Sequence, residues 1–215
     1  MQQEVAAAAV SAGRSPEEIT TIVVTKFHPS SLVRELAQAG VKHVGENRHQ
    51  EAVAKHAELE DLPLTWHFVG QLQSNKAKAV AQYCSVIHSV DRSSLVKSLS
   101  QVEKNLEVFL EVNLTEVPGR GGVEPGEMMA LADSVLSSEN LVLQGLMAVA
   151  PVGVDPGTAF DRVVVLAQEL QSLAPGATNL SLGMSGDFVE AISRGATHLR
   201  IGSAITGKRA DPTYP

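Results

Sequence analysis

The chain has few of the features that mark secreted, membrane or nucleic-acid-binding proteins. Its only cysteine is Cys84, so neither a disulfide framework nor a cysteine-based zinc site can form within one chain. No apolar run approaches the roughly 18 residues of a membrane span, and residues 1–11 lack the basic region of a signal peptide. Basic runs are also missing, and a net charge of −7 argues against nucleic-acid or anionic-membrane surfaces. We therefore expect a cytoplasmic protein with no nucleic-acid or membrane partner.

The histidines do not have the spacing of a metal site. His28, His43, His49 and His56 are spread over an expected loop, strand and helix, so we expect solvated or capping roles and no metal. His67 differs, because it lies within an apolar strand beside Trp66. A hydrogen-bonded core histidine is the favoured interpretation, and a supporting group beneath a ligand is the alternative.

What the chain does contain is a repeated alternation of apolar, strand-like runs and segments of helical period. With 215 residues and a hydrophobic fraction of 44%, it can build one packed core, and we expect a single domain over residues 1–215. The expected strands are 19–26, 41–46, 64–70, 86–90, 108–114, 141–149, 180–184 and 198–201. The expected helices are 1–11, 30–39, 48–59, 74–83, 93–105, 128–136, 160–173 and 188–194, with Ser30 or Ser31 as the cap of the second.

Eight such strands with helices between them predict a closed parallel (β/α)₈ barrel, the TIM barrel. An open, doubly wound sheet is the alternative. Its glycine-rich fingerprint after the first strand is missing, because Lys26-Phe27-His28-Pro29 occupies that place.

A barrel of this kind builds its site from the carboxyl ends of the strands, and here those ends are polar. Buried polar groups need partners, so a packed core gives no reason for such a choice. The residues at the strand exits are Lys26, Glu46, Asn47, His67, Gly70 to Gln73, Asp91, Asn113, Met147, Ser185 and Arg200 to Ser203.

The last two exits have the composition of a phosphate site. Leu182-Gly183-Met184-Ser185-Gly186-Asp187 follows the seventh strand, and Ile201-Gly202-Ser203-Ala204 follows the eighth. Small residues with free backbone N–H groups at a helix start bind anions, and barrels often bind phosphate at these two loops. Either loop alone would be an ordinary turn, but the two together favour phosphate.

The eighth strand of a closed barrel pairs with the first, so Lys26 is expected beside this phosphate site. An amine that can react with an aldehyde, next to a phosphate clamp, is the arrangement that holds pyridoxal 5′-phosphate as a Schiff base. Arg200 is expected to point into the same mouth. An arginine at the pyridine nitrogen would leave that nitrogen unprotonated and weaken the ring as an electron sink.

Several blocks of the sequence resemble the pyridoxal phosphate homeostasis proteins, a family that in turn resembles the amino-terminal barrel of alanine racemase. The most specific are Trp66-His67-Phe68-Val69-Gly70-Gln71-Leu72-Gln73-Ser74-Asn75-Lys76 and Leu182-Gly183-Met184-Ser185. The others are Val24-Thr25-Lys26, Gly45-Glu46-Asn47, Gly145-Leu146-Met147-Ala148 and Arg200-Ile201-Gly202-Ser203-Ala204-Ile205. They run in order from the first strand to Gly207.

The resemblance implies a single-domain protein that binds and delivers the cofactor without a catalytic activity of its own. It implies that Lys26 carries the Schiff base and that Ser185, Gly202 and Ser203 hold the phosphate. It also implies that Arg200 faces the pyridine nitrogen and that Asn47 and Met184 line the ring. The chain departs from the family pattern at Arg48-His49 and at Gly119-Arg120-Gly121-Gly122, so roles for that loop and for Lys76 stay open.

Two other functions compete with this one. A racemase or related enzyme of the alanine racemase type would need a second catalytic group on the far side of the cofactor and a substrate-binding domain. A barrel that binds a different phosphate compound would use Lys26 only as a charge. Apart from the cofactor, the expected partners are enzymes that lack their pyridoxal phosphate, and the expected assembly is a monomer or a weak homodimer.

Overall fold

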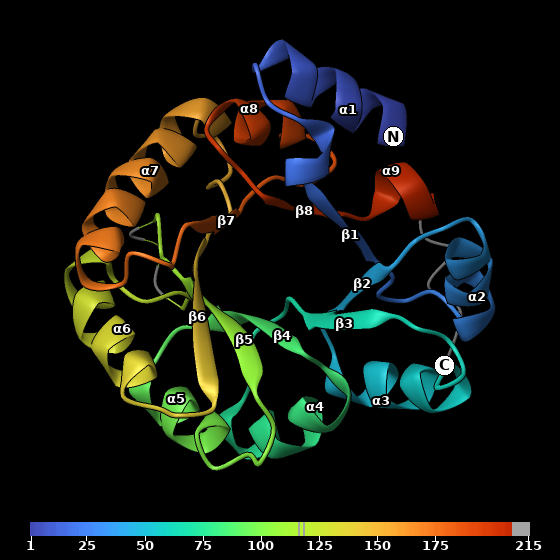
Figure 1. Cartoon of the computed structure of the whole chain (residues 1–215), viewed down its shortest axis with the longest axis horizontal. Coiled ribbons are helices and arrows are strands. Elements are labelled where there is room, and N and C mark those ends of the chain that lie inside the picture. Colours follow the sequence, from blue (N-terminus) through green and yellow to red (C-terminus); the bar gives the residue numbers. More distant parts are fainter. Residues whose placement is uncertain (116, 118, 208–215) are drawn as a thin grey trace.

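The computed structural model describes residues 1–115, 117 and 119–207. In these residues eight parallel strands form a closed barrel in sequence order, which confirms the predicted TIM barrel and excludes the open sheet. Figure 1 shows the strands at the centre of a ring of helices. The strands are β1 (Thr20–Val24), β2 (His43–Glu46), β3 (Thr65–Phe68), β4 (Val86–Val90), β5 (Leu106–Glu111), β6 (Leu141–Met147), β7 (Asn179–Ser181) and β8 (His198–Ile201).

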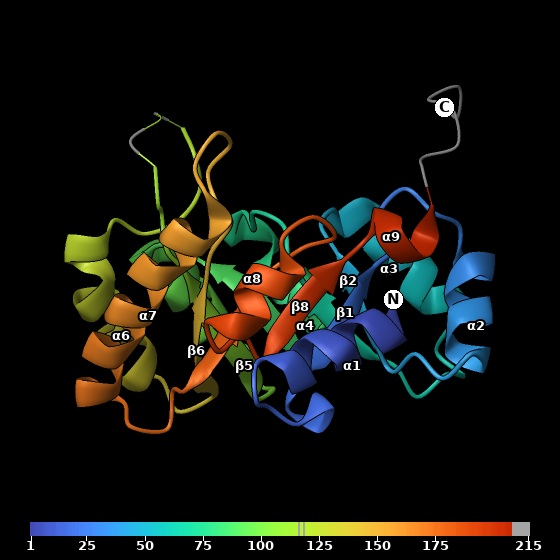
Figure 2. The same ribbon diagram turned by 90° about the horizontal axis from the view of Figure 1, so that it is seen from above.

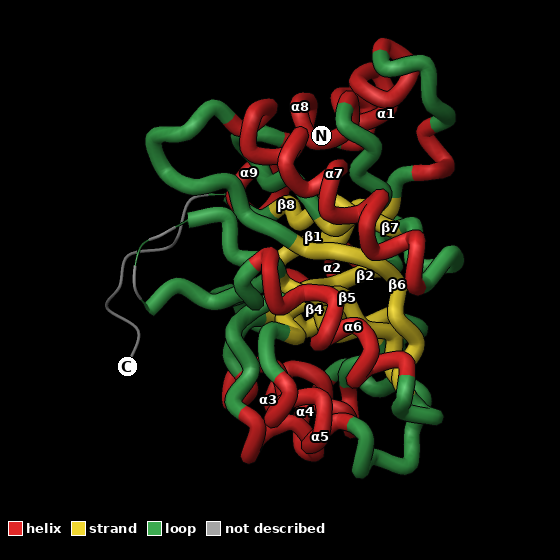
Figure 3. The backbone as a smooth tube through the Cα atoms, turned by 90° about the vertical axis from the view of Figure 1, so that its left-hand side faces the viewer, coloured by secondary structure: helices red, strands yellow, loops and turns green. Residues whose placement is uncertain are grey.

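Helices cover the outside of the barrel, as the tube view in Figure 3 shows. The α-helices of the described part are α1 (Gln2–Ser11), α2 (Ser30–Gln38), α3 (His49–Glu58), α4 (Ala77–Tyr83), α5 (Ser93–Leu99), α6 (Met128–Leu136), α7 (Pro156–Leu173), α8 (Phe188–Ser193) and α9 (Ser203–Thr206). Three short 3₁₀ turns precede β1, α4 and α6: η1 (Pro16–Glu18), η2 (Ser74–Lys76) and η3 (Pro125–Glu127). Helix α1 packs beside α8 on the outside of the ring.

The predicted element ends were correct where a strong start or stop signal was present. The helix 128–136 and the strands 86–90 and 198–201 agree with α6, β4 and β8. The predicted first strand, 19–26, is longer than the observed one, because β1 ends at Val24 and Lys26 lies two residues beyond it. The expected serine cap was also wrong: Pro29 stands at the cap position of α2 and makes no side-chain cap hydrogen bond. Helix α5 ends at Leu99, six residues before the predicted end.

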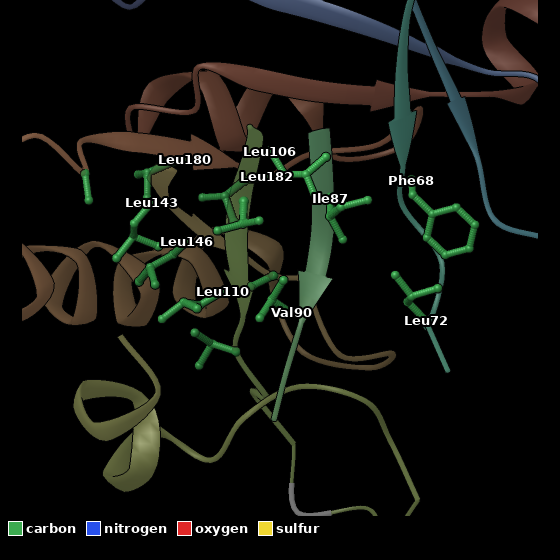
Figure 4. Packing of buried hydrophobic residues seen from close by; sticks show 14 of the residues in the cluster. Phe68, Leu72, Ile87, Val90, Leu106, Leu110, Leu143, Leu146, Leu180 and Leu182 are labelled. Atoms are coloured by element: carbon green, nitrogen blue, oxygen red, sulfur yellow. The ribbon is translucent and has the colours of Figure 1, made fainter. Parts of the chain in front are cut away.

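The core has two layers, because successive residues of a strand point to opposite faces. Outward-facing side chains of the strands pack against the helices in one large buried cluster, of which Phe68, Ile87, Leu110 and Leu146 are seen in Figure 4. Inside the barrel a separate small cluster forms from Val86, Phe109 and Met147. Ile22, which pairs with Arg200, is buried there as well. Many other interior side chains are polar, and these lead to the site.

Closure of the barrel brings the two ends of the chain together. β8 pairs with β1 in parallel, with Ile22 opposite Arg200 and Val23 opposite Ile201. In Figure 2 the connections that follow β5, β6 and β7 rise from the same edge as α9. This edge is the carboxyl end of the strands, where barrels of this type bind their ligands.

Gly145 on β6 allows two strands to approach closely. Its φ is +147°, and a Cβ atom placed there would lie 1.9 Å from the Asn179 carbonyl oxygen on β7. The register of β5 against β6 shifts at the same point, between Val108 and Phe109. No side chain other than hydrogen fits without moving the backbone of β7.

We expect Gly145→Ala to lower the free energy of unfolding by about 3 kcal/mol, because it adds backbone strain to a steric clash inside the sheet. Urea denaturation followed by circular dichroism measures this loss. Gly176→Ala is the matched control, since a Cβ at Gly176 meets nothing within 4 Å. A loss of less than 1 kcal/mol for Gly145→Ala would contradict this account, because it would show that the β7 backbone can move away from the added methyl group at little cost.

Candidate functional site

The loops after β7 and β8 lie against each other and against the end of β1. The backbone N–H of Ala204 donates to the hydroxyl of Ser185 over 3.4 Å, which joins the two loops. A Cβ placed on Gly202 would lie 3.7 Å from the Val24 carbonyl oxygen. The structure thus brings Ser185, Gly202 and Ser203 to the same side of the rim as the end of β1, as barrel closure predicts.

Lys26 lies on an exposed turn just after β1. Its amine forms no hydrogen bond or ion pair with the part of the chain that the structure describes. The next residue, Phe27, has a φ of +66°, a left-handed conformation that is uncommon for residues other than glycine. The Phe27 backbone N–H donates to Glu51 over 3.0 Å, and the Arg48 guanidinium lies 4.8 Å from the centre of the Phe27 ring. Groups in and immediately before the first turn of α3 therefore hold this unusual turn in place.

A buried ion pair fixes the end of β1 from behind. The Glu46 carboxylate, fully buried at the end of β2, accepts hydrogen bonds from the Thr25 hydroxyl and the Lys55 amine, each over 2.7 Å. The same amine donates to the Thr25 carbonyl oxygen over 2.7 Å. Burial raises the pKa of Glu46, although Lys55 and the Thr25 hydroxyl act against that rise. These hydrogen bonds attach Thr25 to β2 and α3, and they therefore fix the backbone position from which Lys26 extends.

The loop after β7 is shaped by a glycine and an aspartate. Gly183 has a φ of +84°, and a Cβ there would lie 2.7 Å from the Cβ of Ala191 on α8. The largely buried Asp187 accepts a hydrogen bond from the Met184 backbone N–H. Met184 itself is 39% exposed at the rim. The tight turn thereby presents Met184 and Ser185 toward the mouth.

Arg200 lies inside the barrel at the end of β8, with only 5% of its surface exposed. Three of its N–H donors reach the Ser181 carbonyl, the Ser181 hydroxyl and the Ala148 carbonyl. Burial lowers the pKa of Arg200 to about 10, and the negative charges of Glu111 and Asp187 oppose that fall. The guanidinium therefore stays charged at neutral pH, with a fixed orientation and further N–H groups left to donate.

A chain of hydrogen bonds runs from Arg200 through the barrel interior. The Ser181 hydroxyl, 2.7 Å from Arg200, is 2.8 Å from His88 Nδ1. His88 Nε2 is 2.9 Å from His67 Nδ1, and His67 Nε2 is 3.0 Å from His43 Nδ1. The chain crosses β8, β7, β4, β3 and β2, and none of its members is adjacent to another in the sequence.

Arginine determines the direction of this chain, because it can only donate. The Ser181 hydroxyl accepts from Arg200. His88 Nδ1 is the other partner of this buried hydroxyl among the described residues, so the Ser181 proton is donated to His88 Nδ1. His88 must then carry its proton on Nε2 and donate to His67, and His67 likewise donates from Nε2 to His43. Every ring in the chain is neutral in this arrangement. Burial is also the main cause that lowers the pKa of each of them, well below 6.5 for His67 and His88.

A carboxyl group with an unusual acidity faces the same interior. Burial, followed by the negative charge of Asp91, raises the pKa of Glu111 to about 7, while Arg200 opposes the rise. His198, stacked edge-on against Phe109, has its pKa lowered to about 4 by burial. In the described residues, the barrel interior therefore holds the permanent cation Arg200 beside histidines that burial keeps uncharged and a carboxyl group that titrates near neutral pH.

Asn47 lies on the next part of the rim. Its side-chain oxygen is buried and has no hydrogen-bond partner within the described residues. A Cβ on Gly70 would lie 2.4 Å from the Asn47 carbonyl oxygen, so glycine at position 70 lets the ends of β2 and β3 meet. Asn47 borders a cavity of about 430 Å³ above β2, β3 and β4. Its other lining residues are Arg48, His49, Gln50, Phe68, Gln71, Leu72, Gln73, Lys76 and Arg92.

Several residues of the site were not found from the sequence. His67 is the predicted core histidine, but His43 was expected to be solvated and instead joins the interior chain. His88, Ser181 and Lys55 were not predicted at all. A signal existed for His88, which is central in the apolar run Val86–Val90 where a core histidine needs a partner. Lys55 carried no such signal, because a lysine on an amphipathic helix usually reaches solvent.

The described residues contain neither a cluster of metal ligands nor a helix that could span a membrane. No group of three or more histidine, cysteine, aspartate or glutamate side chains there could hold a metal ion. None of the helices in those residues is long and apolar enough to cross a membrane.

Comparison with known proteins places this geometry in a family. Residues 13–210 match the family model described as alanine racemase, N-terminal domain. The pyridoxal phosphate homeostasis protein of Pseudomonas aeruginosa is 40% identical over 206 residues, which cover 94% of this chain and 90% of that protein. The structure of PipY from Synechococcus elongatus with PLP bound is 37% identical with a TM-score of 0.81, and covers 93% of this chain and 98% of that one. Alanine racemase from Corynebacterium glutamicum shares the fold, with 13% identity, a TM-score of 0.69 and coverage of 100% of this chain and 62% of that one.

We expect Lys55→Met to lower the free energy of unfolding by about 3 to 5 kcal/mol, because it leaves the buried Glu46 carboxylate without its cation. The double variant Glu46→Gln/Lys55→Met should recover a large part of this loss. Arg34→Met is the control: it breaks an exposed pair with Asp61 and should cost about 1 kcal/mol or less. Urea denaturation of the four proteins measures these differences.

The loss in Lys55→Met should depend on pH. The folded-state pKa of Glu46 is already raised above its ordinary 4.5, so its contribution to stability is present at low pH and decreases as pH rises through the folded value. Without Lys55 this pKa rises further, and the variant should therefore be less destabilised at pH 5 than at pH 8. Equal losses at both pH values would contradict a buried, ionised Glu46.

The interior chain predicts that His67 and His88 remain neutral with the proton on Nε2. Two-bond ¹H–¹⁵N correlation spectra of the imidazole rings, recorded from pH 8 to pH 5, measure both properties. A proton on Nδ1 of His88 in the native protein would overturn the direction derived from Arg200.

The same neutrality makes the fold sensitive to acid. In the unfolded chain these imidazoles take up protons near their ordinary pKa of 6.5, whereas in the folded protein they do not. The unfolded state then binds more protons, so the free energy of unfolding should fall as pH drops below about 6.5.

Proposed function

Since the chain belongs to the family of the pyridoxal phosphate homeostasis proteins, we propose that it binds pyridoxal 5′-phosphate through a Schiff base on Lys26. The phosphate is held by Ser185, Gly202 and Ser203, the pyridine nitrogen faces Arg200, and Asn47 and Met184 line the ring. One observation carries the proposal: the pairing of β8 with β1 brings the end of β1, two residues before Lys26, beside the joined loops after β7 and β8. The bound cofactor supplies an aldehyde that an amine can attack and a conjugated ring.

The residues present fit this group. Gly186 has nothing within 4 Å of a Cβ placed on it, and the nearest atom to a Cβ on Gly202 is 3.7 Å away, so both loops leave space beside their backbone N–H groups. Ser185 adds a hydroxyl, and Ser203 begins α9. Backbone N–H groups and hydroxyls in such loops are the usual donors to a phosphate. The buried, unpartnered oxygen of Asn47 supports the presence of a polar ligand at the other side of the mouth.

Arg200 supports a carrier rather than a catalyst. With three N–H donors engaged by backbone and Ser181, the guanidinium cannot turn away, and its remaining donors require an acceptor. A pyridine nitrogen that accepts from arginine stays unprotonated, which makes the ring a weaker electron sink than one paired with a carboxylic acid. We infer that the protein stores and delivers the cofactor in the cytoplasm, and that enzymes lacking pyridoxal phosphate receive it.

A racemase of the alanine racemase type is the second candidate, favoured by the shared barrel. It requires a second acid or base opposite Lys26. Among the described residues Tyr83 is the one tyrosine, and it lies on α4 with its hydroxyl 3.3 Å from His49 Nδ1. Burial strongly raises the pKa of Tyr83, so its hydroxyl stays protonated at neutral pH and supplies no phenolate to act as a base. Exchange of the α-hydrogen of alanine in deuterated buffer would favour the racemase, and its absence would favour the carrier.

We expect purified protein mixed with pyridoxal 5′-phosphate to show a visible absorption band that Lys26→Ala abolishes. Borohydride reduction should fix the mass of the cofactor on Lys26, which peptide mass spectrometry can locate. Lys97→Ala is the control, because Lys97 is an exposed helical lysine away from the rim. A colourless native protein with no added mass would refute the Schiff base, and an anion site with Lys26 as a charge would replace it.

A further inference from the structure

Residues 66–76 form the block that most specifically resembles the family, and the part of this block after β3 has no role in the proposed cofactor site. Its inward-facing member is His67, but the segment after β3 lines the 430 Å³ cavity above β2, β3 and β4 with Gln71, Gln73 and Lys76. Neither Lys26 nor any of the residues expected to hold phosphate or pyridine nitrogen borders this cavity. Asn47 alone is shared with the proposed cofactor site. The cavity therefore adjoins that site but is distinct from it.

Three cations converge on this cavity from three different strand exits. Arg48 follows β2, Lys76 follows β3 and Arg92 follows β4. The chain as a whole has a net charge of −7, so a cavity lined by three cations has the opposite charge to the rest of the molecule. Like charges that share a concave site repel one another and raise the local concentration of anions. The arrangement is the one expected of an anion-binding pocket.

The counter-charges already present leave part of this positive charge free. Arg92 is paired with Asp91, and Arg48 contacts Glu51 only over 3.5 Å. Lys76 is half-buried, and its amine forms no hydrogen bond or ion pair with the residues that the structure describes. An anionic ligand in the cavity would supply the partner that this amine lacks.

Hydrogen bonds and buried side chains fix the shape of this pocket. Arg92 donates to the Leu72 carbonyl over 2.6 Å and to the Ser74 hydroxyl over 3.3 Å, so its guanidinium has a fixed place beside the segment that carries Lys76. Phe68 and Leu72, both almost fully buried, provide an apolar floor. A volume of about 430 Å³ lies in the range of small-molecule sites and is too large for a bare inorganic ion.

We propose that this cavity binds an organic phosphate with a hydroxylated body, of the size of a sugar phosphate. Arginine forks and a lysine point charge suit a phosphate group. The side-chain amides of Gln50, Gln71 and Gln73 can both donate and accept, as hydroxyl groups require. The site is independent of the Schiff base on Lys26, so it can exist whether or not the proposed function holds.

Isothermal titration calorimetry with glucose 6-phosphate tests the proposal, using full-length protein saturated with pyridoxal 5′-phosphate so that the cofactor site is filled. Glucose is the neutral control. We expect glucose 6-phosphate to bind at least tenfold more tightly than glucose, and binding to weaken as salt is raised. Equal affinity for the two sugars, or no binding of either, would overturn the proposal.

Substitutions locate the site. Lys76→Ala should weaken binding about tenfold or more, whereas Lys78→Ala, which removes an exposed lysine two residues further on, should change it less than twofold. Arg48→Gln is a second variant in case Lys76→Ala fails to fold, because the Arg48 side chain is 60% exposed. It should also weaken binding about tenfold.

One further variant separates the two proposals. Lys26→Ala should bind glucose 6-phosphate as the native protein does, even though it loses the cofactor band. If Lys26→Ala abolishes binding while Lys76→Ala leaves it unchanged, the sugar phosphate occupies the cofactor site and the second pocket is refuted. If the native protein shows no cofactor band but still binds the probe through Lys76, the proposed function fails and the pocket stands.

Discussion

The pairing of β8 with β1 is the constraint on which the site depends. Residues 20–26 and 198–204 are separated by almost the whole chain, yet Ile22 lies opposite Arg200 and Gly202 lies against the Val24 backbone. An open sheet of the same strands would leave these segments at opposite edges. Closure brings the segment that carries Lys26, the small residues of the last two loops and the buried Arg200 to the same end of the barrel.

A single buried charge organises the inside of the barrel. Arg200 can only donate, so the Ser181 hydroxyl and the rings of His88 and His67 must align their protons in one direction. The polar interior is therefore stabilised by matched donors and acceptors, and not by a further ion pair. Burial lowers the pKa values of His67 and His88 well below 6.5, so the side chains that support Arg200 do not titrate near neutral pH.

A buried ion pair fixes the end of β1 on the outer side of the barrel. Glu46 and Lys55 lie between the strands and α3, where they fix the Thr25 backbone from behind. Beyond Thr25, the left-handed turn at Phe27 is held by Glu51. The position of Lys26 is thus set by side chains from β2 and α3 rather than by its own strand, which ends two residues earlier. The rim beyond it, with Asn47 at the boundary, leads from the proposed cofactor site to the cation-lined cavity.

The amino-acid sequence by itself determined the barrel and predicted which polar residues follow the carboxyl ends of its strands. Eight apolar runs alternating with helical segments allow few other folds, and the polar residues at the ends of those runs marked Lys26, Ser185, Arg200 and Gly202 before any contact was known. The hydrogen-bonded chain, the Glu46–Lys55 pair and the cavity beside Lys76 were decided only by the tertiary structure. Strand periodicity gives the face of a residue but not its neighbour across a barrel. Burial of a lysine or histidine depends on which distant side chain arrives to complete its hydrogen bonds, and the local sequence does not record that.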